Sequence, residues 1–154
     1  MSGEGNGSMS TTTHTRSVHI DAPVEKVFDY VKDPQNQWEA YELGDKNTIT
    51  AQDVAPDGGK GSTWAWQGHF LFIPMHGTMT REDYVVNERI VDHSTTGVLW
   101  TYTFAPDDTG TTLTMEVEVS SKVPILDKVE DKLAWHGDED LDTWLGNFKK
   151  AIEA

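Results

Sequence analysis

The chain contains no cysteine, few basic residues and no long apolar run, and each absence excludes a class of function. Without cysteine among its 154 residues, disulfides, thiolate catalysis and cysteine-based zinc sites are excluded. Lys and Arg number 12 against 26 Asp and Glu, and the net charge of -14 disfavours nucleic acids and anionic membrane surfaces as partners. No apolar run approaches the ~20 residues that span a bilayer, and no basic-then-apolar secretory signal begins the chain. We therefore expect a cytoplasmic protein without nucleic-acid partners or stable membrane insertion.

The chain is rich in large aromatic side chains. Six Trp, five Phe and four Tyr can bury extensive apolar surface, although only 36% of the residues are hydrophobic. Residues 1–12 are mostly Gly, Ser, Thr and Asn, with almost nothing to bury, and are predicted to be a disordered leader. The remaining residues, 13–154, are enough for one domain with its own core.

Apolar periodicity predicts a strand, two short helices and then a series of strands. Val18 and Ile20 alternate with polar residues over 14–20, and Pro23 suits the first turn of a following helix. A second short helix is expected at 35–41. From residue 48 the period is two, which is typical of antiparallel hairpins with one apolar face. The strands are predicted at 49–54, 62–70, 78–86, 89–94, 98–104 and 111–120.

A single long helix is predicted over residues 123–154. Its apolar residues recur at steps of three and four, with a gap between His136 and Asp140. Gly137 in this gap either interrupts a continuous helix or marks a break, after which Asp138 caps a new helix. The predicted fold class is α+β, a curved antiparallel sheet of about six to seven strands wrapped around this helix.

Short motifs in a fixed order run through the chain. They are VHIDAPVEKVF at 18–28, Asp33-Pro34 before Trp38, GKGSTW at 59–64, NERIV at 87–91, GTTLT at 110–114 and NFK at 147–149. Together they resemble the START-related helix-grip superfamily, which includes polyketide cyclase/dehydrase-like proteins and the birch-pollen-allergen fold. The resemblance covers residues 13–153 and departs at Glu88, where the family commonly has proline. It implies a helix-grip ligand-binding domain with an apolar cavity between sheet and helix, and a hydrophobic or amphipathic ligand such as a lipid, sterol or polyketide.

The large side chains on the predicted inner face are candidates for lining that cavity. Whether these rings line a pocket or fill the core is open. The candidates are Trp64, Trp66, Phe70, Met79, Trp100, Tyr102, Met115, Val129, Leu133 and His136.

Three ionisable residues are candidates for catalysis. His136 and Asp140 lie four residues apart on one helical face, so the carboxylate could orient the ring and raise its pKa for acid–base chemistry. The alternative is a frayed acidic turn with a half-solvated His136. Arg81 points inward if Met79 does, and a buried Arg requires an anionic partner; the alternative is a solvated Arg on an edge strand. No histidine pair has metal-site spacing, and neither a metal nor a cofactor is expected.

These candidates leave three functions open. The favoured one is a carrier or sensor that binds a hydrophobic small molecule without chemistry. The alternative is a cyclase or aromatase of the cyclase/dehydratase type that uses His136, Asp140 or Arg81. The third is an interaction module with a filled cavity, in which the apolar segment 71–75, predicted to be a bend or edge because of Pro74, contacts a partner. The same apolar segment could instead form a homodimer contact, and this alternative is also left open.

Overall fold

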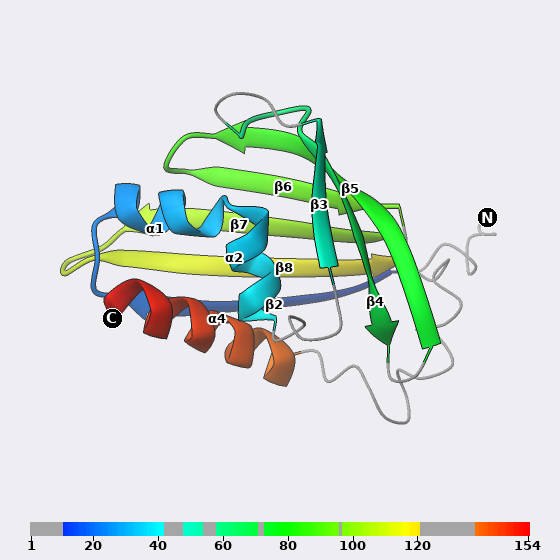
Figure 1. Cartoon of the computed structure of the whole chain (residues 1–154). Helices are drawn as coiled ribbons and strands as arrows, with labels where there is room; N and C mark the ends of the chain where they lie inside the picture. Colours follow the sequence, from blue (N-terminus) through cyan, green and yellow to red (C-terminus); the bar gives the residue numbers. More distant parts are fainter. Residues whose placement is uncertain (1–10, 42–47, 54–57, 71–72, 96, 121–137) are drawn as a thin grey trace, which may run out of the picture.

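A computed structural model describes residues 11–41, 48–53, 58–70, 73–95, 97–120 and 138–154. One strand is followed by two short helices, six further strands and a C-terminal helix (Figure 1). The elements are β2 (Thr11–Ile20), α1 (Val24–Val31), α2 (Pro34–Ala40), β3 (Thr48–Asp53), β4 (Thr63–Phe70), β5 (Ile73–Val85), β6 (Arg89–Ser94), β7 (Val98–Pro106), β8 (Thr111–Ser120) and α4 (Asp138–Glu153).

The strands form one seven-stranded antiparallel sheet in the order β2-β8-β7-β6-β5-β4-β3. Strands β3 to β8 pair with their neighbours in the chain as consecutive hairpins, while the first strand, β2, pairs with the last. The described helices lie on one side of this curved sheet (Figure 1). The predicted α+β class and sheet are therefore confirmed.

Two strand boundaries differ from the sequence-based expectation. Strand β2 begins at Thr11 rather than near residue 14, because its pairing with β8 continues to the end of that strand, where Thr11 faces Ser120. Residues 73–75 belong to β5, and Pro74 pairs with His69 of β4, so of the two expectations for this segment the bend is wrong and the edge is confirmed. Pairing between β5 and β6 starts only at Met79, so Pro74 lies in a part of β5 that is an edge of the sheet, where proline is tolerated.

Helices α1 and α2 each begin one residue from the predicted position, at Val24 rather than Pro23 and at Pro34 rather than Gln35. Pro23 precedes α1 in an extended conformation, and the helix buries Val27, Phe28 and Val31 against the sheet. At α2, the Asp33 side chain accepts a hydrogen bond from the backbone N–H of Gln35 at 2.9 Å, which satisfies one of the free donors of the first turn.

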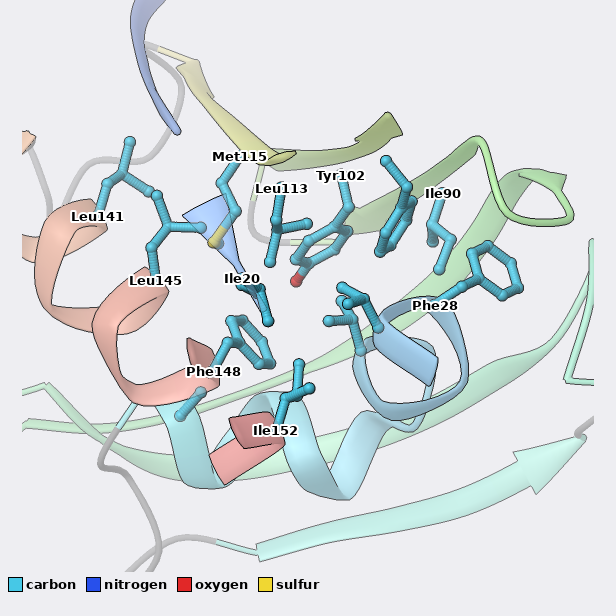
Figure 2. Close-up of a cluster of buried hydrophobic side chains, with 14 of the residues drawn as sticks. Ile20, Phe28, Ile90, Tyr102, Leu113, Met115, Leu141, Leu145, Phe148 and Ile152 are labelled. Carbon is cyan, nitrogen blue, oxygen red and sulfur yellow. The ribbon is translucent and has the colours of Figure 1, made fainter. Parts of the chain in front are cut away.

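Helix α4 closes the core over strands β2 and β8. It buries Leu141, Leu145, Phe148 and Ile152, which point toward strand residues such as Leu113 (Figure 2). Residues 138–140 are all acidic, which is favourable at the positive end of the helix dipole. The preceding part of the predicted long helix, 123–137, lies outside the described residues, as does the question of a break at Gly137.

Polar contacts hold the outer side of α4 to strand β2. Near the start of α4, Arg16 donates two hydrogen bonds to the carboxylate of Asp142, at 2.9 and 3.1 Å. At the end of α4, Lys149 donates to the backbone carbonyl of His19 at 2.8 Å, and Glu153 accepts from the backbone N–H of Asp21 at 2.7 Å. Exposed pairs of this kind contribute little free energy each, so their main effect is to set the position of the helix along the strand.

A histidine clamped between two carboxylates joins the end of β2 to the β7–β8 turn. His19 Nδ1 lies 2.7 Å from Asp107 Oδ2, and its Nε2 lies 2.7 Å from Asp21 Oδ1. Both bonds are satisfied when the ring carries two protons, so the hydrogen bonds to Asp107 and then Asp21 raise the pKa of His19. Gly110 completes the turn, because a side chain there would overlap the carbonyl oxygen of Ile20.

We expect this clamp to make stability depend on pH. Because the folded-state pKa of His19 is raised, its contribution is fully present below the ordinary histidine pKa of about 6.5 and is lost as the pH rises through the folded value. Between about pH 6 and pH 9, the free energy of unfolding of the wild type should fall relative to that of His19→Gln. Urea denaturation at a series of pH values measures the difference.

The matched control is His76→Gln, which removes an exposed histidine from β5. Its pH profile should run parallel to the wild type. A His19→Gln profile that also runs parallel to the wild type would contradict a stabilising clamp.

Candidate functional site

Cross-strand pairing aligns four side chains across the helix-facing side of the sheet. Val117 of β8 faces Trp100 of β7, Trp100 faces Asp92 of β6, and Asp92 faces Arg81 of β5. Val117, Asp92 and Arg81 are buried. The row therefore runs from an apolar end beneath α4 to a charged end near the β3–β4 turn.

Arg81 and Asp92 form a buried, two-pronged ion pair. Arg81 Nε donates to Asp92 Oδ1 at 2.9 Å, Nη2 donates to Oδ2 at 3.1 Å, and each side chain is 1% exposed. The expectation that Arg81 points inward with Met79 is confirmed, since Met79 is also buried. The solvated alternative for Arg81 is wrong, because the β5–β6 register places a carboxylate opposite the guanidinium.

The surroundings of this pair satisfy its remaining polar atoms. Arg81 Nη1 donates to the carbonyl of Gly58 at 2.8 Å, and the guanidinium carbon lies 5.0 Å from the centroid of the Trp64 ring. Burial raises the pKa of Asp92, while hydrogen bonds from Arg81 and Gln37 oppose that rise. The guanidinium of Arg81 is thus hydrogen-bonded to Asp92 and to the carbonyl of Gly58 in the β3–β4 turn.

Four rings next to the pair form what we call the aromatic cluster: Tyr41, Trp100, Tyr102 and Trp144. Tyr41 stacks on Trp100 with centroids 5.0 Å apart and an interplanar angle of 16°. Trp144 lies 4.8 Å from Tyr41 and 5.6 Å from Trp100. The hydroxyls of Tyr41 and Tyr102 are hydrogen-bonded to each other. The cluster joins the end of α2, strand β7 and helix α4.

The two tyrosines of the cluster are neutral groups. Burial raises the pKa of both Tyr41 and Tyr102, and the nearby carboxylate of Asp92 raises both further. Neither phenol ionises at physiological pH. Their hydroxyls therefore provide hydrogen bonding without charge.

The cluster lies at the border of the closed core. Tyr102 is 1% exposed and Tyr41 7% exposed, whereas Trp100 and Trp144 are only half-buried. The indole Nε1 of Trp100 is buried and has no hydrogen-bond partner within the part of the chain that the structure describes. An unsatisfied buried donor of this kind requires an explanation.

The structure places the other sequence-predicted site residues as follows. Trp64 and Met115 are buried, and Asp140 is half-buried in the first turn of α4. Trp66 and Phe70 belong to strand β4, but their side chains are not among those described. Val129, Leu133 and His136 lie outside the described residues, so their place in a cavity and the pairing of His136 with Asp140 stay predictions.

Sequence reasoning did not assign three residues to the site: Tyr41, Asp92 and Trp144. Asp92 shares its parity with buried Ile90, so a carboxylate on the inner face of β6 was a signal for a partner of Arg81. Tyr41 and Trp144 belong to apolar stripes of their helices, and no sequence pattern indicates that they meet.

A separate groove lies at the junction of α1, α2 and the end of α4. It encloses about 380 Å³ and is open to solvent. Its lining residues are Lys26, Asp29, Tyr30, Asn36, Ala151, Ile152 and Ala154. The aromatic cluster does not contribute to it.

The described residues contain no group of three or more His, Asp or Glu side chains arranged to hold a metal ion. Nor do they include a helix long and apolar enough to cross a membrane.

A curved antiparallel sheet that packs against a C-terminal helix, with two short helices after the first strand, defines a helix-grip protein. The family model described as "Polyketide cyclase / dehydrase and lipid transport" matches residues 11–153, and the chain belongs to that family. The family resemblance found in the sequence is thereby confirmed. A search of curated proteins found no significant match.

Solved structures share this fold at low sequence identity. Protein SA2116 from Staphylococcus aureus, described as of unknown function, is 13% identical with a TM-score of 0.66, over 97% of this chain and 100% of its own. TTHA0849 from Thermus thermophilus is 18% identical with a TM-score of 0.64, over 93% of this chain and 97% of its own. The di-domain ARO/CYC protein BexL from the BE-7585A biosynthetic pathway is 21% identical with a TM-score of 0.64. That match covers 94% of this chain and 50% of BexL.

We expect Arg81 and Asp92 to be strongly coupled energetically. Arg81→Met leaves a buried carboxylate without its partner and Asp92→Leu leaves a buried guanidinium, so each should lower the free energy of unfolding by about 3–5 kcal/mol. The double variant removes both charges and should lose much less than the sum of the two. Urea denaturation of the four proteins gives the coupling energy.

A neighbouring exposed pair supplies the control. Arg89 and Asp83 lie 2.7 Å apart but are largely exposed, so the cycle with Arg89→Met and Asp83→Leu should give a coupling below ~1 kcal/mol. Additive losses at Arg81 and Asp92 would contradict the assignment of this pair as the buried anchor of the site.

Proposed function

We propose that this protein binds a hydrophobic or amphipathic small molecule, such as a lipid, sterol or polyketide-like compound, between its sheet and C-terminal helix, and that it acts as a carrier or sensor. The observation that carries the proposal is the aromatic cluster on the inner face. Two of its rings, Trp100 and Trp144, are half-buried at the edge of an otherwise closed core. Large rings with a polar tip are typical of sites that bind and orient apolar ligands.

The packing of the core supports a position for the ligand beside this cluster. Under α1 and α4 the inner face is filled, since Phe28, Leu113 and Phe148 are at most 1% exposed (Figure 2). Burial decreases along β7 from Tyr102 toward Trp100 and Val98. A ligand that covered this part of the strand would bury apolar surface at ~25 cal/mol per Å².

The charges of the site favour binding over catalysis. Among the described buried residues, the ionisable side chains are Arg81, Asp92, Tyr41 and Tyr102. The first two neutralise each other, and the raised pKa values of the tyrosines keep them protonated. General acid–base catalysis requires a group that exchanges a proton near the working pH. The two tyrosines do not supply one, and the carboxylate of Asp92 is engaged by two hydrogen bonds from Arg81.

A cyclase or dehydratase-type enzyme is the second candidate. The family description includes polyketide cyclases and dehydrases, and BexL is described as an ARO/CYC protein. Such an activity in this chain would use His136 and Asp140, since Arg81 is committed to Asp92. The interaction module that uses residues 71–75, and with it a homodimer, also stays a prediction.

Binding can be tested with N-phenyl-1-naphthylamine, a neutral apolar fluorophore whose emission rises in a dry site. The wild type should bind it saturably, and Trp144→Ala should weaken binding about tenfold, because a ring contact contributes ~0.5–1.5 kcal/mol beyond the area buried. Fluorescence titration, with circular dichroism to confirm the fold, provides the measurement.

Val86→Ser is the control, since Val86 is 60% exposed in the turn between β5 and β6 and should not contribute to binding. The same affinity in Trp144→Ala as in the wild type would exclude the aromatic cluster as the site. Native mass spectrometry of protein from its own cells tests for a retained ligand, and conversion of that ligand by the purified protein would favour the enzyme.

A further inference from the structure

The buried indole N–H of Trp100, a member of the aromatic cluster, has no hydrogen-bond partner among the residues that the structure describes. We infer that its indole N–H determines specificity by donating to a neutral oxygen of the bound molecule, a carbonyl, ether or hydroxyl oxygen on a ring-containing compound. This inference rests on the proposed function and deepens it, because it names the chemical feature that the site selects.

The first argument is hydrogen-bond satisfaction. The Nε1 atom of Trp100 is buried and, within the described parts of the chain, has no acceptor. An indole N–H is a donor only, so whatever satisfies it has to be an acceptor. Buried donors are nearly always paired in folded proteins, and a bound molecule would supply the missing partner.

The second argument is that the polar groups next to Trp100 already have partners. Its cross-strand neighbour Asp92 accepts two hydrogen bonds from Arg81. The hydroxyls of Tyr41 and Tyr102 bind each other. Each of these groups thus has at least one partner, whereas the indole N–H of Trp100 has none among the described contacts.

The third argument is preorganisation. Tyr41 stacks nearly parallel on Trp100, with centroids 5.0 Å apart and an angle of 16°, and Trp144 packs 5.6 Å away at 41°. These contacts hold the indole plane and so determine the direction of its N–H. A donor held in one direction loses little conformational freedom when an acceptor binds.

The fourth argument concerns the charge of the ligand. Arg81, the cation nearest along the row, is bound by Asp92 and by the carbonyl of Gly58. A ligand carboxylate at Trp100 would lie beside Asp92 without a cation of its own, and burying an unpaired charge is costly. A neutral acceptor avoids that penalty. The aromatic cluster in turn favours a ring that can pack against its faces.

The test compares two probes that differ in one oxygen, 9-fluorenone and fluorene, by displacement of N-phenyl-1-naphthylamine. Trp100→Phe keeps an aromatic ring but removes the N–H donor. We expect it to weaken 9-fluorenone binding about five- to tenfold, the size of one neutral hydrogen bond, and fluorene binding by less than about twofold. Trp144→Phe is the control and should change the two affinities by the same factor.

Each outcome decides between the two proposals. Equal weakening of both probes by Trp100→Phe would make Trp100 a packing residue and overturn the inference alone. Tighter wild-type binding of fluorene-9-carboxylate than of 9-fluorenone would overturn the neutral-ligand class. Wild-type protein that binds none of the probes would overturn the proposed function, and the inference with it.

Should Trp100→Phe fail to fold, benzothienylalanine at position 100 replaces it. This residue has nearly the same bicyclic shape as tryptophan, with sulfur in place of the N–H. A selective loss of 9-fluorenone binding would support the inference, and an unchanged ratio of the two affinities would overturn it.

Discussion

The buried pair of Arg81 and Asp92 is the interaction on which the inner face of this sheet depends. Two charges removed from water are tolerated only when each satisfies the other and their remaining polar atoms find partners. Here Gly58, Gln37 and the Trp64 ring complete the arrangement, and the pair thereby joins β5, β6, α2 and the β3–β4 turn. The same pair determines the chemistry of its surroundings. It neutralises the cation and the carboxylate nearest to Trp100, so the aromatic cluster beside it interacts through ring faces and neutral hydrogen bonds.

Helix α4 contributes both to the aromatic cluster, through Trp144, and to the hydrophobic core, through its apolar stripe. Its position is set at both ends by polar contacts with β2, through Arg16 and Asp142 at one end and Lys149 with the carbonyl of His19 at the other. None of these exposed contacts is strong by itself.

The molecule combines a strongly acidic composition with a neutral inner site. The net charge of -14 repels polyanions in general, whereas the described buried ionisable groups are either paired or uncharged. A neutral, apolar ligand is compatible with both features, because it needs neither a cation in the site nor electrostatic attraction at the surface. Membership of a family that contains cyclases, dehydrases and lipid-transport proteins is consistent with that chemistry but does not choose among these activities.

The sequence by itself determined the order of the elements and the α+β class, and it placed Arg81 on the same face of its strand as Met79, while the burial of that face was left open. These follow from local rules: the period of two in the strands, the proline and aspartate at the helix starts, and the parity that Arg81 shares with Met79. It did not determine where β2 begins or that residues 73–75 join β5, because both depend on how far the neighbouring strand extends. It also could not select Asp92 as the partner of Arg81, since that pairing requires the β5–β6 register, which shifts between Arg81 and Asp83. The aromatic cluster was decided only by the tertiary structure. Tyr41, Trp100 and Trp144 come from three segments that are distant in the sequence. They meet because of how α2 and α4 pack on the sheet, and such long-range packing cannot be derived from local sequence patterns.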